Sequence, residues 1–500
     1  MGLRLIYGRA GTGKSEKCYK EISEKIKQNN KILIITPEQF SFTAEKKLME
    51  AIETESVFNA EVVTFSRMAY RVIQEIGGRT ETNLSKCGKA MLIYSILNNC
   101  KKDLKFLGKT DENVDMAGTA ITEFKKHGIS VEQLKQETEK QSDIYLKNKL
   151  NDINMIYEKF QEQIAGKYID ETDLLTILAQ NVDKVPDFKD NLIYIDEFAG
   201  FTSQEYDIIQ KLVKIAKQVT ITICTDTIHE IKNADTDIFY SNQITINKLL
   251  QIASENDIKI EEVELEQTYR FKTPELKHLE KNLYNSKTNY FEQIPQNIKI
   301  FLAKNQYSEI EEVAKKIYKL VRDENYRYRD IAVITKNIDT YSSLARAIFD
   351  KYNIPIFIDE NRDLSQNILV QYVLSILEIF TKNWTEEAVL NYIKIGFSEI
   401  DEDDLFRLEK YCLKWGIKQN KWKKEFTYGN YEEKDKEEIA RLEEIRKQII
   451  EPLISLKNKL DENKIAEGIS RTIYNFLIEQ NIAEKIKQKQ EKLEEQGLID

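Results

Sequence analysis

A glycine-rich loop near the start of the chain constrains the fold more than any other feature. It follows a short apolar run, Leu3–Tyr7, and precedes a helical pattern, Glu16–Gln28. The spacing G-x-x-x-x-G-K-[ST] in this strand–loop–helix context is typical of loops whose backbone N–H groups surround phosphates at a helix N-terminus. The loop consists of Gly8, Arg9, Ala10, Gly11, Thr12, Gly13, Lys14 and Ser15.

The two polar residues at the end of the loop predict a nucleotide bound with a metal ion. Lys14 is expected to reach the β- and γ-phosphates of ATP, and the Ser15 hydroxyl to bind Mg²⁺. An ordinary glycine-rich turn beside a surface lysine is the alternative. In a chain with only 17 glycines, we favour nucleotide binding.

A second motif offers the carboxylate that such a metal needs. The apolar run Leu192–Ile195 ends in Asp196 and Glu197, the arrangement called Walker B. Asp196 is expected to contact the magnesium ion, directly or through water. Glu197 is the candidate general base that would polarise the attacking water. The alternative is a strand that simply ends in an acidic turn.

The pattern of apolar runs predicts an α/β fold with a parallel sheet, because short Ile-, Val- and Leu-rich runs alternate with longer amphipathic patterns. Two stretches, about 68–188 and 366–500, have mostly helical periodicity. Strands are expected at Leu3–Tyr7, Lys31–Ile35, Glu61–Thr64, Leu192–Ile195, Val219–Ile223, Ile260–Leu265, Ile298–Leu302, Ile331–Ile334 and Ile354–Ile358.

Composition narrows the function classes. The 500 residues carry 74 Lys and Arg against 84 Asp and Glu, a net charge of −10, so any nucleic-acid site must be a local basic groove. The five cysteines form no C-x-x-C pair, which disfavours a disulfide framework or a zinc knuckle. The longest apolar stretch, Asn367–Phe380, is interrupted by polar residues and is too short to span a bilayer. We therefore expect a soluble, cytoplasmic protein without membrane contact.

Further motifs resemble those of superfamily 1, UvrD/Rep-like helicases, which have RecA-like P-loop NTPase folds with large helical insertions. Thr64–Ala69 resembles the T-F-H-S-x-A motif that touches single-stranded DNA, so Thr64, Phe65 and Arg67 become candidate DNA-binding residues. Leu265–Arg270 resembles L-x-Q-N-Y-R, whose arginine approaches the γ-phosphate. This likeness adds Arg270 to the nucleotide site, with a structural salt bridge as its alternative role.

The resemblance also suggests how the chain is divided. Residues 1–270 are expected to form a first RecA-like domain that carries the helical insertion at about 68–188. Residues 271–365 would begin a second RecA-like domain, and residues 366–500 would be a truncated helical insertion. The pattern of the chain is unfinished at residues 497–500, so we expect it to be the front part of a longer protein.

The likeness is more specific to one branch, the AddB (RexB) family, a subunit of the AddAB helicase–nuclease. It implies a heterodimer with AddA that binds single- and double-stranded DNA ends, resects double-strand breaks for recombination and recognises a hotspot sequence. It also implies a 5′–3′ exonuclease with a [4Fe–4S] cluster beyond residue 500. The AddB-like segments are Thr36–Ser41, Lys167–Asp170, Asp196–Thr202, Tyr326–Val333 and Ile354–Asp359.

Several helicase motif positions are altered. His229 stands where helicases have a phosphate-sensing glutamine, and Gly200 replaces an aspartate after the acidic pair. The adenine-reading glutamine upstream of the phosphate loop and the later motifs with their phosphate-contacting arginine are missing from this segment. We therefore expect ATP binding with little or no hydrolysis. Two alternatives remain: an active superfamily 1 motor, and a scaffold for AddA that never binds nucleotide.

Aromatic and basic residues mark two candidate DNA surfaces. Phe65 and Arg67 form the first, although packing of Phe65 in the core is an alternative. The second is the segment from Lys414 to Lys424, which contains two tryptophans and five lysines. Contact with DNA or a partner is one interpretation of this segment. A solvated helix that carries buried tryptophans is the other.

Overall fold

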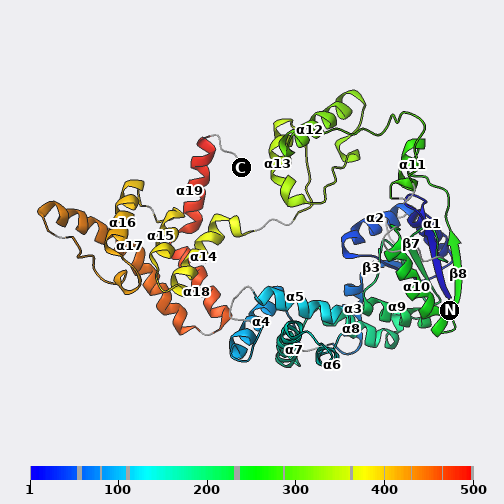
Figure 1. Cartoon of the computed structure of the whole chain (residues 1–500), viewed down its shortest axis with the longest axis horizontal. Coiled ribbons are helices and arrows are strands. Elements are labelled where there is room, and N and C mark those ends of the chain that lie inside the picture. Colours follow the sequence, from blue (N-terminus) through cyan, green and yellow to red (C-terminus); the bar gives the residue numbers. More distant parts are fainter. Residues whose placement is uncertain are drawn as a thin grey trace. The chain divides into compact units, whose positions relative to one another are not determined.

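Six strands form a parallel sheet in the first part of the chain (Figure 1). Their order is β3-β2-β6-β7-β1-β8, and every adjacent pair is parallel. The first six predicted strands are confirmed to within one residue at each end, and the sheet confirms an α/β fold. The strands are β1 (Gly2–Gly8), β2 (Ile32–Ile35), β3 (Ala60–Val63), β6 (Leu192–Ile195), β7 (Gln218–Cys224) and β8 (Lys259–Glu264).

The structure is a computed structural model in which the chain divides into two units, Met1–Phe301 and Leu302–Asp500. Residues 497–500, where the sequence pattern is unfinished, lie outside the described residues. The structure describes residues 2–52, 59–78, 81–107, 113–229, 237–284, 288–360, 364–398, 400–429, 431–463 and 465–496.

Helices cover both faces of the sheet, which explains why its strands are nearly continuous apolar runs. Alternate side chains of one strand point to opposite faces: Leu5 lies in one buried cluster and Ile6 in the other. Helices α1 (Lys14–Lys27) and α2 (Ser41–Ile52) pack on the Ile6 side. The Leu5 side is covered by α3 (Phe65–Glu75), α8 (Glu171–Asn181), α9 (Ser203–Ile215) and α10 (Tyr240–Glu255).

A helical region between β3 and β6 has a core of its own, centred on Ile93, Ile156 and Phe160. Two short parallel strands, β4 (Thr82–Asn83) and β5 (Tyr168–Ile169), lie at its border, and sequence reasoning did not predict them. The helices that enclose this core are α4 (Lys86–Cys100), α5 (Asn113–Lys126), α6 (Val131–Glu139) and α7 (Ile144–Ile164).

A buried ion network ties this helical region to α8. Lys125 pairs with Asp170 at 3.2 Å and with Asp173 at 2.9 Å, and Lys89 pairs with Asp170 at 2.9 Å. Burial raises the pKa of Asp170, but the two lysines outweigh it and the net pKa is lowered. Removing one partner would leave a buried charge uncompensated, so the network fixes how these elements meet.

The second unit is helical in its described residues. Helices α12 (Gln306–Asp323) and α13 (Ile338–Lys351) pack around Ile310, Ala314 and Phe349. A larger core holds the remaining helices together. These are α14 (Ile368–Thr381), α15 (Glu386–Lys394), α16 (Glu402–Trp415), α17 (Glu433–Glu462), α18 (Ala466–Glu479) and α19 (Ile482–Glu495).

Three predicted strands are wrong for this structure. The segments Ile298–Leu302, Ile331–Ile334 and Ile354–Ile358 form no strand. A strand exists only when a neighbouring backbone accepts and donates its hydrogen bonds, and among the described residues none pairs with these segments. Several of their apolar side chains are open, with Ile334 92% and Leu302 100% exposed, whereas Ile354 is buried against α12 and α13.

Candidate nucleotide site and adjacent DNA-contact surface

The phosphate loop leaves the sheet at the carboxyl end of β1, which is paired on both sides by β7 and β8. Helix α1 begins at Lys14, so the last two residues of the loop form its first turn. Gly13 caps this helix with φ of 82° and Gly11 has φ of 75°, left-handed conformations that glycine adopts without strain. The first N–H groups of α1 therefore face the loop, as an anion site at a helix N-terminus requires.

Lys14 lies across the loop that precedes it. Its Nζ donates to the carbonyl oxygens of Gly8 at 2.8 Å and Arg9 at 2.9 Å. Burial lowers the pKa of Lys14. The ammonium group is thus held over the backbone that would surround the phosphates, where an anionic ligand would favour its charged form.

Asp196 is buried at the end of β6, on the same edge of the sheet as the phosphate loop. Thr222 of β7 donates a hydrogen bond to Oδ1, whereas Oδ2 is buried without a hydrogen-bond partner. Burial raises the pKa of Asp196, and the hydrogen bond from Thr222 opposes the rise. A buried, unsatisfied carboxylate oxygen is costly, so this atom fits a cation or a metal-bound water.

Ser15 and Asp196 would together hold Mg²⁺, which would neutralise charge on the bound phosphates. The described residues contain no group of three or more His, Cys, Asp or Glu side chains that could hold a metal ion. A P-loop site does not need one, since nucleotide oxygens and water complete the coordination of magnesium.

Glu197 is turned toward α2 by an unusual backbone conformation, with φ of 68°. Its Oε1 accepts a hydrogen bond from Ser15 Oγ at 3.4 Å and forms an ion pair with Lys47 at 3.2 Å. The candidate general base is therefore close to the loop, but a lysine holds the same oxygen. The sequence motifs gave no indication of Lys47.

Residues after β8 close over the phosphate loop. The backbone N–H groups of Tyr269 and Arg270 both donate to the carbonyl oxygen of Gly11, at 2.8 and 3.3 Å. The Arg270 Cβ lies so near that a Cβ on Gly11 would meet it at 2.5 Å. The structure thus places Arg270 beside the loop, with its side chain exposed there.

Arg9 and His229 turn to partners outside the loop. Arg9 forms ion pairs with Glu280 of α11 (Pro274–Asn282) at 3.1 Å and with Asp226 at 3.6 Å. His229 Nε2 lies 3.1 Å from a carboxylate oxygen of Glu262. Arg9 was predicted from its place in the loop, but its partners, more than 200 residues away in sequence, were not.

The three candidate DNA-contact residues have different environments. Thr64 is buried and caps α3 by accepting from the N–H of Arg67 at 3.2 Å. Phe65 is 5% exposed and packs edge-to-face on Phe198, with ring centroids 5.6 Å apart. A base-stacking role for Phe65 does not fit this position, because its ring belongs to the core. Arg67 is exposed and pairs with Glu45 at 3.4 Å.

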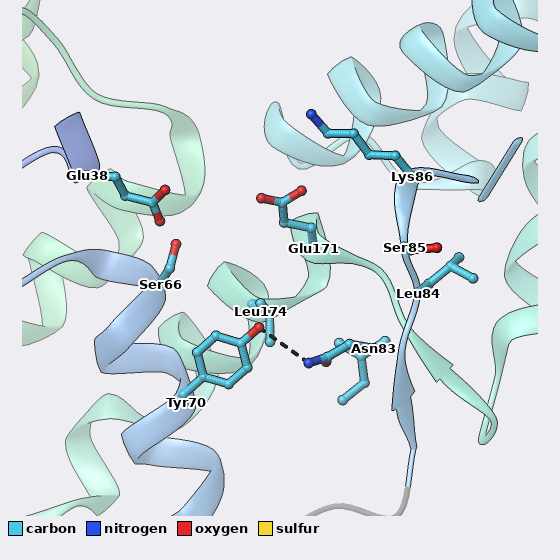
Figure 2. Close-up of a pocket in the computed structure, with 10 residues that line it drawn as sticks. Glu38, Ser66, Tyr70, Asn83, Leu84, Ser85, Lys86, Glu171 and Leu174 are labelled. Carbon is cyan, nitrogen blue, oxygen red and sulfur yellow. Dashed lines mark hydrogen bonds between the residues drawn. The ribbon is translucent and has the colours of Figure 1, made fainter. Parts of the chain in front are cut away.

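A pocket of about 240 Å³ opens between α3 and the border of the helical region, and Ser66, the residue before Arg67, lines it. Figure 2 shows Tyr70 facing Asn83 across it, and Asn83 Nδ2 donates to Tyr70 Oη at 3.4 Å. Ser66 and Lys86 lie on opposite sides of the same pocket. Sequence reasoning missed Tyr70 and Asn83, although Tyr70 is one turn after Ser66 in α3. The pocket offers an aromatic ring, hydroxyl and amide groups, the ammonium group of Lys86, and the carboxylates of Glu38 and Glu171.

Among the described residues, every helix is too short or too polar to cross a bilayer.

Comparison with known proteins identifies the family. The family model described as "ADDB, N-terminal" matches residues 5–280. Relatives from Clostridium tetani and Clostridium novyi are 40% and 37% identical to this chain over 97% and 99% of its length. One from Caldanaerobacter subterraneus is 38% identical over 100%. All three are named as a subunit of an ATP-dependent helicase/deoxyribonuclease, and the aligned region covers 44% of each. The chain therefore spans less than half the length of these relatives, and it belongs to the AddB family.

Proposed function

We propose that this chain is the ATP-binding, DNA-binding, helicase-like part of an AddB subunit. The observation that carries the proposal is the meeting of Lys14, Ser15 and the unsatisfied oxygen of Asp196 at one edge of the sheet. ATP with Mg²⁺ is the ligand that such a loop and carboxylate suit.

We also propose that the first part of the chain is a RecA-like P-loop domain of the superfamily 1 type. Its support is a wholly parallel sheet that carries the phosphate loop after β1 and the acidic pair after β6. On this proposal residues 1–270 form that domain with its helical insertion. Residues 271–365 begin a second RecA-like domain, and residues 366–500 are a helical insertion.

ATP would serve chiefly as a structural or regulatory ligand. The candidate base Glu197 is ion-paired with Lys47, and His229 lies 3.1 Å from a carboxylate oxygen of Glu262. A carboxylate that is held by an ammonium group is a weaker acceptor for the proton of an attacking water. This arrangement favours binding over turnover.

Single-stranded DNA would run along Arg67 and the adjacent pocket. Arg67 is the exposed cation of the T-F-S-R-M-A segment, and Tyr70, one turn further along α3, is 44% exposed at the pocket. Basic charge beside an aromatic ring is the combination that binds single strands. Arg67→Ala should weaken the affinity for a single-stranded oligonucleotide and flatten its salt dependence. Arg71→Ala, on the same helix but less exposed than Arg67 and paired with both Glu61 and Asp187, is the control.

The relatives are more than twice as long as this chain, so we propose a function for a whole protein of that length as well. The subunit would pair with AddA to unwind and resect double-strand breaks for recombination and to recognise a hotspot sequence. Its remaining part would hold a 5′–3′ exonuclease with a [4Fe–4S] cluster.

Thermal unfolding and ATP turnover test the proposal together. Saturating Mg·ATP should raise the melting temperature of the wild type and leave that of Lys14→Ala unchanged, with little turnover in either. DNA-stimulated turnover that Lys14→Ala abolishes would instead indicate an active motor. No stabilisation of the wild type would indicate a scaffold that does not bind nucleotide.

A further inference from the structure

The second unit carries a concentrated positive charge that the nucleotide site does not explain. Five lysines lie in the eleven residues from Lys414, in the last turn of α16, to Lys424, three residues after the short helix η6 (Gln419–Lys421). No acidic residue stands between positions 410 and 424, although the whole chain has a net charge of −10. We call these residues the lysine cluster: Lys414, Lys418, Lys421, Lys423 and Lys424.

The charges of the lysine cluster are not neutralised within the described residues. Lysines elsewhere in this unit form ion pairs, such as Lys394 with Glu409 at 2.7 Å. None of the five forms an ion pair with another described residue, and Lys421 donates instead to the carbonyl oxygen of Trp415 at 3.0 Å. Like charges held together without counter-charges cost free energy, which an external anion would recover.

Aromatic rings hold several of these ammonium groups in place. Lys414 lies 5.1 Å from the ring centroid of Trp415, and Lys421 lies 5.1 Å from that of Tyr428. Lys423 lies 5.3 Å from the ring of Trp384. Such contacts fix the position of an ammonium group without neutralising it.

The base of the cluster is rigidly packed. Trp422 is fully buried, and its carbonyl oxygen accepts from Arg446 Nη1 at 2.9 Å. Arg446 is itself buried and paired with Glu443. The interpretation of the tryptophans as core residues is thus right for Trp422, yet the lysines around it remain outside the core. The surface is preorganised, so binding would cost little ordering of the backbone.

We propose that the lysine cluster binds the phosphate backbone of double-stranded DNA without regard to sequence. Lysine is a compact point charge suited to phosphate, and several such contacts provide sequence-independent affinity. Two aromatic rings beside the lysine cluster, those of Trp415 and Tyr428, stack on each other. Their centroids are 5.7 Å apart and their planes differ by 18°. Since these two rings cover each other, the cluster favours backbone contact over the base stacking that single strands use. The choice of DNA as the polyanion rests on the proposed function.

The test is fluorescence anisotropy with the 500-residue chain and a blunt duplex of about 25 base pairs, over a range of salt concentrations. The triple variant Lys418→Gln, Lys423→Gln, Lys424→Gln removes three exposed charges and spares the intramolecular bond of Lys421. Its Kd should rise about 10- to 100-fold at about 100 mM salt, and its salt slope should fall by about 2 to 3. The far-UV circular dichroism spectrum and the midpoint of urea unfolding should be unchanged, which shows that the unit is folded.

A matched control removes the same charge elsewhere in the unit, through Lys436→Gln, Lys487→Gln and Lys492→Gln, all exposed lysines. The control should bind duplex like the wild type. Equal losses in both triple variants would overturn the proposal in favour of bulk charge. An unchanged duplex Kd in the cluster variant would also overturn the proposal. A loss of affinity confined to a single strand of the same length would do the same. Stabilisation by Mg·ATP and the single-strand affinity lost in Arg67→Ala are measured in parallel, so failure here is distinguishable from failure of the proposed function.

Discussion

Two regions of the molecule contain similar apolar runs, but only one of the two runs forms a strand. Leu192–Ile195 is a fully buried strand, paired with β2 on one side and β7 on the other. Ile331–Ile334 has a comparable composition, yet it forms no strand and Ile334 is 92% exposed. The difference lies in the neighbours, because β2 and β7 offer β6 a complete set of backbone partners. A run of residues with high β-propensity can therefore form a strand, but whether it does so depends on pairing with strands that are distant in the sequence.

The largest effect is expected from matched truncations in the two regions. Ile221→Ala in β7, at a fully buried position, should destabilise the first unit by about 3 to 4 kcal/mol, because it leaves a cavity in the core. Ile334→Ala should change the stability of the second unit by less than about 0.5 kcal/mol.

Urea unfolding can separate the two units, since all three tryptophans, Trp384, Trp415 and Trp422, lie in the second. Ile221→Ala should shift the transition seen by circular dichroism and leave the tryptophan transition in place. A large loss from Ile334→Ala would remove the contrast between the two regions, because it would mean that this segment is packed in solution.

A smaller effect is expected at the buried carboxylate. Asp196→Asn should raise the stability of the nucleotide-free protein by roughly 1 kcal/mol at neutral pH, because it removes a buried charge with an unsatisfied oxygen. The same change should abolish stabilisation by Mg·ATP.

The stability gained by Asp196→Asn should increase with pH. Burial raises the pKa of Asp196 in the folded protein above its ordinary value of 3.8, so the unfolded chain binds fewer protons between the two values. The stability that the protonated Asp196 carboxyl group contributes is therefore lost as the pH rises from 3.8 through the folded pKa. The advantage of Asp196→Asn should grow over that window, as thermal melts between about pH 4 and pH 7 would measure. An advantage that shrinks with rising pH would contradict the burial argument.

The smallest effect on stability is expected at Lys47. The Lys47–Glu197 pair is partly exposed, so Lys47→Ala should cost less than about 1 kcal/mol. Because it releases the carboxylate, ATP turnover should rise several-fold from its low level. Lys46→Ala, whose ammonium faces Glu50 at 3.9 Å, is the control and should leave turnover unchanged. If the two variants have equal turnover, Lys47 does not restrain the base.

Sequence reasoning found the features that are local in the chain. The loop from Gly8 to Ser15 and the Asp196–Glu197 pair were identified because strand, turn and helix signals lie next to each other. Sequence reasoning did not identify contacts made by tertiary packing, such as those of Lys47 with Glu197 and of Arg9 with Glu280.

Phe65 shows a second kind of limit. An aromatic residue after a strand fits a stacking surface and a core equally well in sequence. The partner that settles its place, Phe198, is 133 residues further along the chain. The three unpaired segments were mistaken for strands for the same reason, since a strand depends on neighbours that its own sequence does not contain.

Hydrogen exchange with and without Mg·ATP is the sharpest test of the nucleotide site, because it locates the ligand on the chain. We expect slower exchange in residues 11–15 and at the end of β6 around Asp196. Exchange in the second unit and throughout Lys14→Ala should be unchanged. Protection confined to the second unit, or no protection in the wild type at saturating Mg·ATP, would contradict a nucleotide site at this edge of the sheet.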